Sequence, residues 1–236
     1  MSARREVIDA GIFESSEVAG QREYVSRRPV SGWNPESFAR EQIQGLVRKV
    51  FLSNAMLPVR QVVFSAVDAE TDVHNICRRV GEALALETTG TVAVMGGFPR
   101  LVQDAEIQAI EEETRPGSIP PLRRIATRVR GNLWLVPGAA GDGDRLTTAS
   151  LHSYLGELRR EFEYSIVEAG LAGESNETTA MAQFADGIIL VLSAQHTRRV
   201  TARKVTQALD AAQAHLLGTV LSDRTFPIPE GIYRRL

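Results

Sequence analysis

The sequence predicts an α/β protein with a three-layer, mostly parallel sheet and helices on both faces. Six short, mostly apolar runs lack the alternation of half-exposed strands, which is typical of parallel strands buried on both faces. Segments with apolar residues at helical spacing separate these runs. Hydrophobic residues make up 43% of the 236 positions and charged residues 24%, the usual composition of a globular protein.

The elements follow in order along the chain. Residues 1–34 are polar with little periodicity, so they are predicted to form a flexible or docking extension. The domain is predicted to cover residues 35–236, because Asn34, Pro35 and Glu36 form a helix-start signature. Predicted strands cover residues 61–66, 91–95, 132–136, 164–168, 187–192 and 216–221. Predicted helices cover residues 35–53, 72–87, 102–113, 147–162, 176–184 and 197–214.

Charge, apolar run length and cysteine content argue against several classes of protein. The chain has 27 basic and 29 acidic residues, a net charge of −2, which gives no case for nucleic-acid or anionic-membrane binding. The longest aliphatic run is about six residues, whereas a membrane helix needs roughly 20. The charged N-terminal segment does not match a secretory signal. Cys77 is the single cysteine, and we interpret it as a buried apolar residue of a cytoplasmic protein.

The loop after the first strand is the most informative segment. Ligands of open α/β sheets bind at the carboxyl ends of the strands, and a phosphate-binding P-loop there needs glycines, a lysine and a Ser or Thr. Residues 65–74 read Ser-Ala-Val-Asp-Ala-Glu-Thr-Asp-Val-His, without glycine or lysine. Three acids, Asp68, Glu70 and Asp72, would repel a polyphosphate. We interpret Asp72 as the cap of the following helix rather than as a metal or catalytic residue.

Several other motifs carry a resemblance to a known family. They are Glu41-Gln-Ile-Gln-Gly-Leu-Val-Arg-Lys-Val-Phe51, Phe162-Glu-Tyr-Ser-Ile-Val-Glu168, Ala185-Asp-Gly-Ile-Ile-Leu-Val-Leu192 with Thr197-Arg-Arg, and Leu217-Gly-Thr-Val-Leu-Ser222. In this order, residues 36–236 resemble the cytoplasmic ATPase domain of bacterial tyrosine kinases of exopolysaccharide synthesis. These kinases are related to the MinD/ParA P-loop ATPases. The resemblance implies a P-loop NTPase-like fold and, in the family, the use of ATP and magnesium.

The resemblance also places the family's site on this sequence. The P-loop glycines fall near Glu70 and Asp72, the lysine near Val73 and the magnesium-binding Ser or Thr near His74. The Walker B acid falls on Glu168, and the second acidic motif falls on residues 95–98, which contain no acid. We therefore predict a degenerate nucleotide site with no cofactor and no metal. Its residues are Asp68, Glu70, Asp72, Val73 and His74 at the P-loop and Glu168 at the Walker B position.

Two further family features are altered. The family's first helix carries a Glu-x-x-Arg-x-x-Arg motif for ring assembly. Here Glu41 is kept, whereas Gln44 and Val47 stand at the two arginine positions; Glu41, Gln44 and Arg48 mark a candidate homo-oligomer helix. The family's C-terminal tyrosine cluster is reduced to Tyr233, a candidate phospho-acceptor.

Three functions are compatible with these features. The first is a non-catalytic regulatory or interaction protein of exopolysaccharide or capsule synthesis and export. By resemblance its partner is a membrane polysaccharide co-polymerase or a sister ATPase or kinase, which would recruit it from the cytoplasm to the inner membrane without its own membrane insertion. The second is an active ATPase or tyrosine kinase in which Arg78 and Arg79 replace the lysine. The third is a small-molecule binding protein that uses the glycine-rich residues 138–143.

Overall fold

The computed structural model of this chain describes residues 35–53, 58–96, 121–138 and 147–223, all within one folded unit, Trp33–Leu236. The predicted extension 1–34, the predicted helix 102–113 and Tyr233 lie outside the described residues. The predicted extension and domain limits therefore remain predictions.

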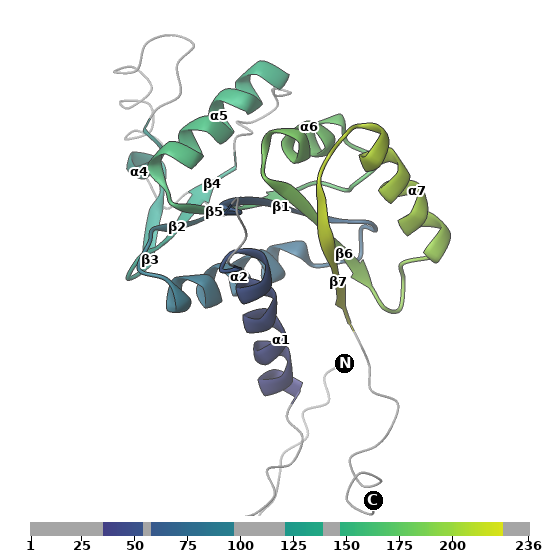
Figure 1. Ribbon diagram of the computed structural model, residues 1–236, viewed down its shortest axis with the longest axis horizontal. Helices are drawn as coiled ribbons and strands as arrows, with labels where there is room; N and C mark the ends of the chain where they lie inside the picture. Colours follow the sequence, from purple (N-terminus) through teal and green to yellow (C-terminus); the bar gives the residue numbers. More distant parts are fainter. Residues whose placement is uncertain (1–34, 54–57, 97–120, 139–146, 224–236) are drawn as a thin grey trace, which may run out of the picture. The chain divides into compact units, whose positions relative to one another are not determined.

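The centre of the fold is a seven-stranded sheet with the strand order β3-β4-β2-β5-β1-β6-β7. Six of its strands run parallel, and only β3 is antiparallel, at one edge beside β4. Figure 1 shows the sheet through the middle of the domain. The strands are β1 (Gln61–Ala66), β2 (Val92–Gly96), β3 (Thr127–Arg130), β4 (Leu133–Pro137), β5 (Tyr164–Ala169), β6 (Gly187–Ser193) and β7 (Leu216–Ser222).

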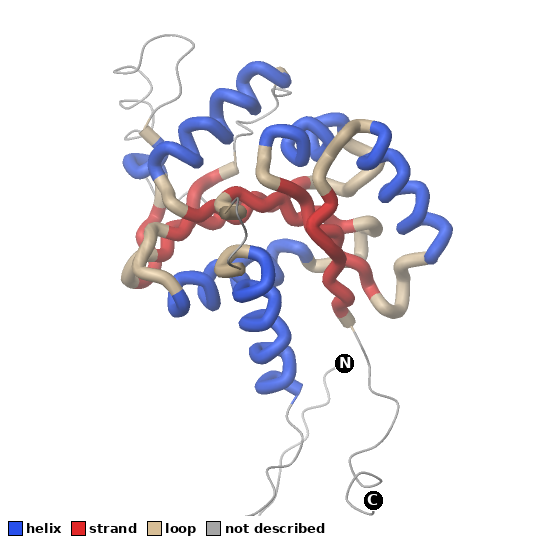
Figure 2. The backbone as a smooth tube through the Cα atoms, in the orientation of Figure 1, coloured by secondary structure: helices blue, strands red, loops and turns tan. Residues whose placement is uncertain are grey.

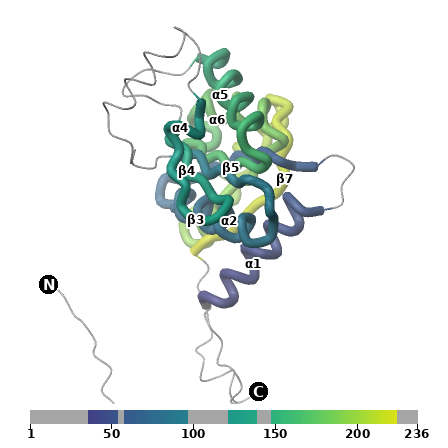
Figure 3. The backbone as a smooth tube through the Cα atoms, turned by 90° about the vertical axis from the view of Figure 1, so that its left-hand side faces the viewer, coloured from purple at the N-terminus to yellow at the C-terminus, as the bar shows by residue number. Residues whose placement is uncertain are grey.

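Helices cover both faces of the sheet, which confirms the predicted three-layer α/β fold (Figure 2). One face carries α1 (Pro35–Val50) and α2 (Val73–Glu87). The other face carries α4 (Leu122–Ile125), α5 (Thr148–Glu161), α6 (Asn176–Phe184) and α7 (Arg199–Ala211). The side view in Figure 3 separates the two helical layers, with the sheet between them.

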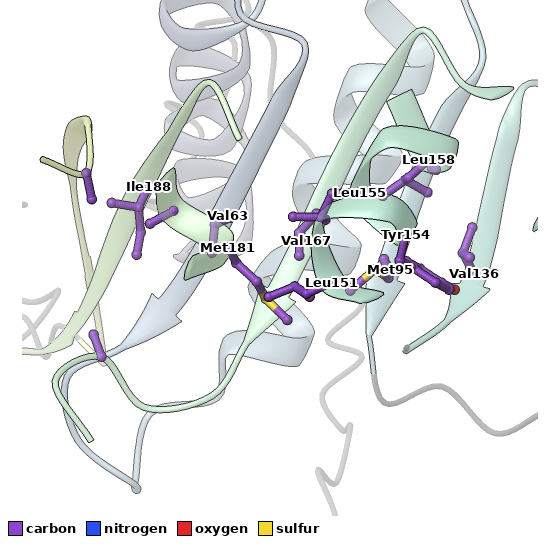
Figure 4. Packing of buried hydrophobic residues seen from close by; sticks show 14 of the residues in the cluster. Val63, Met95, Val136, Leu151, Tyr154, Leu155, Leu158, Val167, Met181 and Ile188 are labelled. Carbon is purple, nitrogen blue, oxygen red and sulfur yellow. The ribbon is translucent and has the colours of Figure 1, made fainter. Parts of the chain in front are cut away.

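Each face of the sheet has its own hydrophobic core. On the α5–α6–α7 face, helix residues such as Leu151, Leu155 and Met181 pack on strand residues such as Val63 and Val167 (Figure 4). On the opposite face, the buried side of α2 packs on β1 and β2. Strand β1 is buried at all six positions, as expected for a central parallel strand enclosed by helices.

One sequence prediction was wrong. The sequence predicts six strands, whereas the structure has a seventh, β3, preceded by the short helix α4. Strand β3 reads Thr-Arg-Val-Arg and is mostly exposed, so it lacks the apolar run on which the prediction depended. It is an antiparallel edge strand with charged side chains, a common feature of sheet edges. In the described ranges, no helix is long and apolar enough to cross a bilayer.

Candidate nucleotide-site region

The candidate site lies at the carboxyl ends of three neighbouring strands. Strand β1 pairs with β5 on one side and with β6 on the other. The loops that follow these strands therefore meet at one edge of the sheet, where open α/β folds bind ligands. The backbone joins the loops as well, because Ala172 N–H donates to the Ala66 carbonyl at 2.8 Å and Val67 N–H donates to the Val191 carbonyl at 3.2 Å.

The loop between β1 and α2 ends in a carboxylate cap. One Asp72 carboxylate oxygen accepts a hydrogen bond from the Asn75 backbone N–H at 3.0 Å, which confirms the predicted cap. This N–H is one of the unpaired donors at the start of α2, the groups that bind phosphate in a P-loop. Throughout residues 67–72, no residue has a positive φ. The loop therefore lacks the alternating backbone conformation that makes an anion-binding nest.

Asp68 ties this loop to the loop after β6. Its carboxylate accepts hydrogen bonds from Thr71 Oγ1 at 2.6 Å and from Thr197 Oγ1. Thr197 Oγ1 in turn accepts from the Ser193 backbone N–H at 2.8 Å. Burial raises the pKa of Asp68, but the hydrogen bonds from Thr197 and Thr71 and the nearby His196 outweigh this, so the net pKa lies below its ordinary value of 3.8. Asp68 is therefore an ionised, anchored carboxylate at neutral pH.

His74 and Glu168 form a side-chain hydrogen bond across the strand ends. His74 is the second residue of α2, and its Nδ1 lies 2.9 Å from Oε2 of Glu168 in β5. The side chain of His74 is 43% exposed and that of Glu168 is 22% exposed. Gly96 at the end of β2 makes room for this pair, since a Cβ at that position would overlap the Glu168 carboxylate. The two positions assigned to magnesium ligation by the resemblance therefore bond to each other.

Cys77 lies behind this pair, one turn further along α2. It is fully buried. Burial, together with the charges of Glu168 and Asp72, raises the pKa of its thiol well above the usual value. A thiol in this state is a poor nucleophile and a poor metal ligand. The interpretation of Cys77 as a buried apolar residue is thus confirmed.

The structure brings together only part of the predicted site. Asp68, Asp72, His74 and Glu168 lie around the ends of β1 and β5, whereas Glu70 is exposed and makes none of these contacts. Val73 is buried in the core under α2. Within the described ranges, no three His, Cys, Asp or Glu side chains are placed to hold a metal ion.

The remaining candidate residues lie elsewhere. Glu41, Gln44 and Arg48 are on α1, where Arg48 pairs with Glu87 of α2 at 2.6 Å. Arg78 approaches Glu82, one turn further from the start of α2, at 3.8 Å. Of the glycine-rich residues 138–143, only Gly138 is described, and its N–H donates to the Gly96 carbonyl at 2.8 Å.

Sequence reasoning missed two participants, Thr71 and Thr197, which hold Asp68. Thr197 was part of a motif in the sequence, but only as a helix start. The adjacency of β1 and β6 is the signal that connects it to Asp68, and adjacency is a property of the sheet order.

Comparisons with known proteins agree with this geometry at the level of the fold. No family model and no curated protein sequence matches the chain. Solved structures do match. The kinase domain of VpsO superimposes with a TM-score of 0.60 at 13% identity, over 80% of this chain and 98% of that one. The kinase domain of the Escherichia coli tyrosine kinase ETK gives 0.56 at 10% identity, over 81% and 79%. MinD of Aquifex aeolicus gives 0.53 at 14% identity, over 75% and 72%.

These matches define the class of fold. The chain has the α/β fold of MinD/ParA-type P-loop NTPases. Within that class, its structural neighbours include bacterial tyrosine kinase domains, so the resemblance predicted from the sequence is confirmed for the fold.

Proposed function

We propose that this chain is a non-catalytic relative of the exopolysaccharide tyrosine-kinase ATPase domains, a pseudo-ATPase that acts by binding other proteins. The observation that carries the proposal is the contact between His74 and Glu168. A P-loop site uses the Ser or Thr after the lysine and the Walker B acid to place magnesium. Here an imidazole replaces the hydroxyl and bonds to the acid at 2.9 Å. Magnesium prefers oxygen ligands. Replacing the hydroxyl by the His74 imidazole therefore removes one ligand, and the hydrogen bond from this imidazole occupies the second, Glu168.

The β1–α2 loop, which would bind the phosphates, is also unfavourable for a nucleotide. Asp72 already occupies the start of α2, and Asp68 is an ionised carboxylate held in the same loop. A phosphate charge about 4 Å from one carboxylate meets a repulsion of about 4 kcal/mol at an effective dielectric constant of about 20. The loop supplies no lysine to offset this repulsion. Nucleotide binding would therefore require the loop to rearrange.

Arg78 and Arg79 are poorly placed to replace the lysine. They lie five and six residues after Val73, the first residue of α2, which is about 7–9 Å along the helix axis. Arg78 is also directed towards Glu82, away from the start of the helix. The active-kinase alternative therefore has no contact in its favour within the described region.

Calorimetric titration with ATP and with ADP, in the presence of magnesium, tests the proposal. We expect no saturable binding, that is, a dissociation constant weaker than about 1 mM, or about −4 kcal/mol. Glu168→Gln should leave this result unchanged, and Asp210→Asn, the same chemical change on the exposed face of α7, is the control. Micromolar affinity together with ATP turnover that Glu168→Gln abolishes would refute the pseudo-ATPase proposal.

The proposed setting is exopolysaccharide or capsule synthesis and export, with a polysaccharide co-polymerase or a sister kinase as partner. Support comes from the fold shared with tyrosine kinase domains and with the CapA2B2 chimera, which matches at a TM-score of 0.58 and 11% identity. The proposed location is the cytoplasm, with recruitment to the inner membrane by the partner. Pull-down of the tagged protein with the products of neighbouring genes tests this setting. Capture of unrelated proteins alone would contradict it.

A further inference from the structure

The exposed side of α7 carries an unusual concentration of positive charge. Four cations fall within seven residues, and all four side chains are exposed: Arg198, Arg199, Arg203 and Lys204. The only acid of the helix is Asp210, near its end. No ion pair joins any of the four cations to an acid of the described chain. The charge of this surface is therefore not neutralised within the described part of the chain.

The second basic cluster of the chain behaves differently. Arg123 donates to the Glu161 carbonyl at 2.6 Å and lies over the rings of Trp134 and Phe162. Arg128 donates to the Gly131 carbonyl at 2.6 Å and lies over Trp134 as well. These arginines cover aromatic side chains and bind main-chain oxygens within the domain. The α7 cations have no such role, so packing does not explain them.

The position of Arg198 and Arg199 also opposes helix formation. Arg198 is the N-cap residue and forms no side-chain cap, and the first turn contains no acid. The positive end of a helix dipole favours anions and disfavours cations. By contrast, α2, α5 and α6 each begin with a side-chain cap, from Asp72, Thr147 and Ser175. A local arrangement that weakens a helix without a compensating contact is the kind of conflict that marks a functional surface.

The α7 surface is hollowed as well as charged. A shallow hollow of about 420 Å³ is lined by Arg199, Ala202, Arg203, Thr206 and Gln207. Ala202 and Thr206 are half-buried, whereas the two arginines and Gln207 stand exposed around them. Beside the hollow, Val200 is 66% exposed. An apolar side chain flanked by carboxylates would fit this surface. The apolar side chain would lie against Ala202, Thr206 and the exposed Val200, and the carboxylates would meet Arg199 and Arg203.

We propose that this α7 surface binds an acidic segment of a partner protein. The arginines of this surface favour an acidic protein segment as the occupant, because a planar guanidinium binds a carboxylate with two parallel hydrogen bonds. The net charge of the chain is −2, so a nucleic acid or an anionic bilayer would meet an acidic molecule outside this small surface. Figure 1 shows α7 at one edge of its helical layer, on the side of β7. The proposal is independent of nucleotide binding, because no α7 cation contacts His74 or Glu168 in the described structure.

Fluorescence anisotropy with a labelled dodecapeptide of repeated Glu-Glu-Leu tests the proposal on the full chain. We expect saturable binding that weakens with ionic strength, and a loss of about tenfold or more in the double variant Arg199→Glu, Arg203→Glu. The milder double variant Arg199→Gln, Arg203→Gln should lose affinity in the same direction. It keeps the proposal testable if charge reversal disturbs the fold, which circular dichroism would reveal.

The matched control is the double variant Lys49→Glu, Arg130→Glu, which makes the same change in net charge at exposed sites on α1 and β3. We expect it to retain most of the affinity. Equal losses in the two double variants, or no peptide binding by the wild-type chain, would overturn the proposal. Tighter binding to phosphatidylglycerol vesicles or to single-stranded DNA than to the peptide would also overturn it. None of these results depends on ATP, so the outcome is separate from that of the nucleotide titration.

Discussion

Thr197 offers a sharp test of how the loops at the candidate site are held together. Its hydroxyl donates to the Asp68 carboxylate and accepts from the Ser193 backbone N–H. Thr197→Val keeps the shape of the side chain and removes both bonds. A hydrogen bond to a charged group contributes about 1.5–3 kcal/mol, and an ordinary one about 1 kcal/mol. We expect the free energy of unfolding at neutral pH to fall by about 2–3 kcal/mol, since part of this site is open to water.

The pH dependence identifies the cause. Because the folded pKa of Asp68 lies below 3.8, Asp68 contributes stability that is complete above this value and is lost as the pH falls through the lower folded pKa. Removing the Thr197 donor raises the folded pKa towards its ordinary value. The difference in unfolding free energy between wild type and Thr197→Val should therefore be largest at neutral pH and shrink under acid conditions.

Urea unfolding followed by circular dichroism, repeated over a series of pH values, measures this difference. Thr201→Val is the control, because Thr201 lies exposed in α7, four residues after Thr197, and makes no contact with Asp68, and we expect it to change stability by less than about 0.5 kcal/mol. A loss in Thr197→Val that stays constant from neutral to acid pH would refute the assignment to the Asp68 carboxylate. It would assign the loss to the Ser193 N–H instead.

Three further predictions concern two helix glycines and the buried cysteine. Gly81→Ala should destabilise the fold by about 1–3 kcal/mol, because its Cβ would overlap Val94 in the buried layer between α2 and β2. Gly156→Ala on α5 meets no atom within 4 Å and should stabilise by about 0.5–1 kcal/mol, and thermal unfolding measures both. Cys77 should resist a thiol reagent in the native state and react only on unfolding. Rapid labelling at neutral pH without denaturant would contradict its burial.

The sequence predicted the parts of the fold that hydrophobic pattern determines. The buried strand β1 and the helix α2 with its Asp72 cap follow from local patterns, and both are confirmed. Strand β3 was missed, because an exposed edge strand of Thr-Arg-Val-Arg has no buried pattern to reveal it. Its place in the sheet depends on pairing with β4 instead.

The sequence could predict the residues of the site within each loop, but not the contacts between loops. Asp68, Asp72, His74 and Glu168 could be named from strand ends and from the resemblance. Their contacts depend on the strand order, which the apolar runs do not contain. Thr197 lies 129 residues from Asp68 in the chain, and only the neighbouring positions of β1 and β6 bring the two together.

The contacts at this edge of the sheet explain how the proposed pseudo-ATPase could hold its loops together without a nucleotide. In a P-loop ATPase, the phosphates and magnesium hold the loops that surround them. Here side chains join the same regions. Asp68 connects the β1 loop to Thr197, and His74 connects the start of α2 to Glu168 at the end of β5. Since these bonds need no ligand, they join the loop after β1 to the segment before α7 in the absence of a nucleotide. A partner bound at α7 would then meet a surface whose shape is independent of ATP.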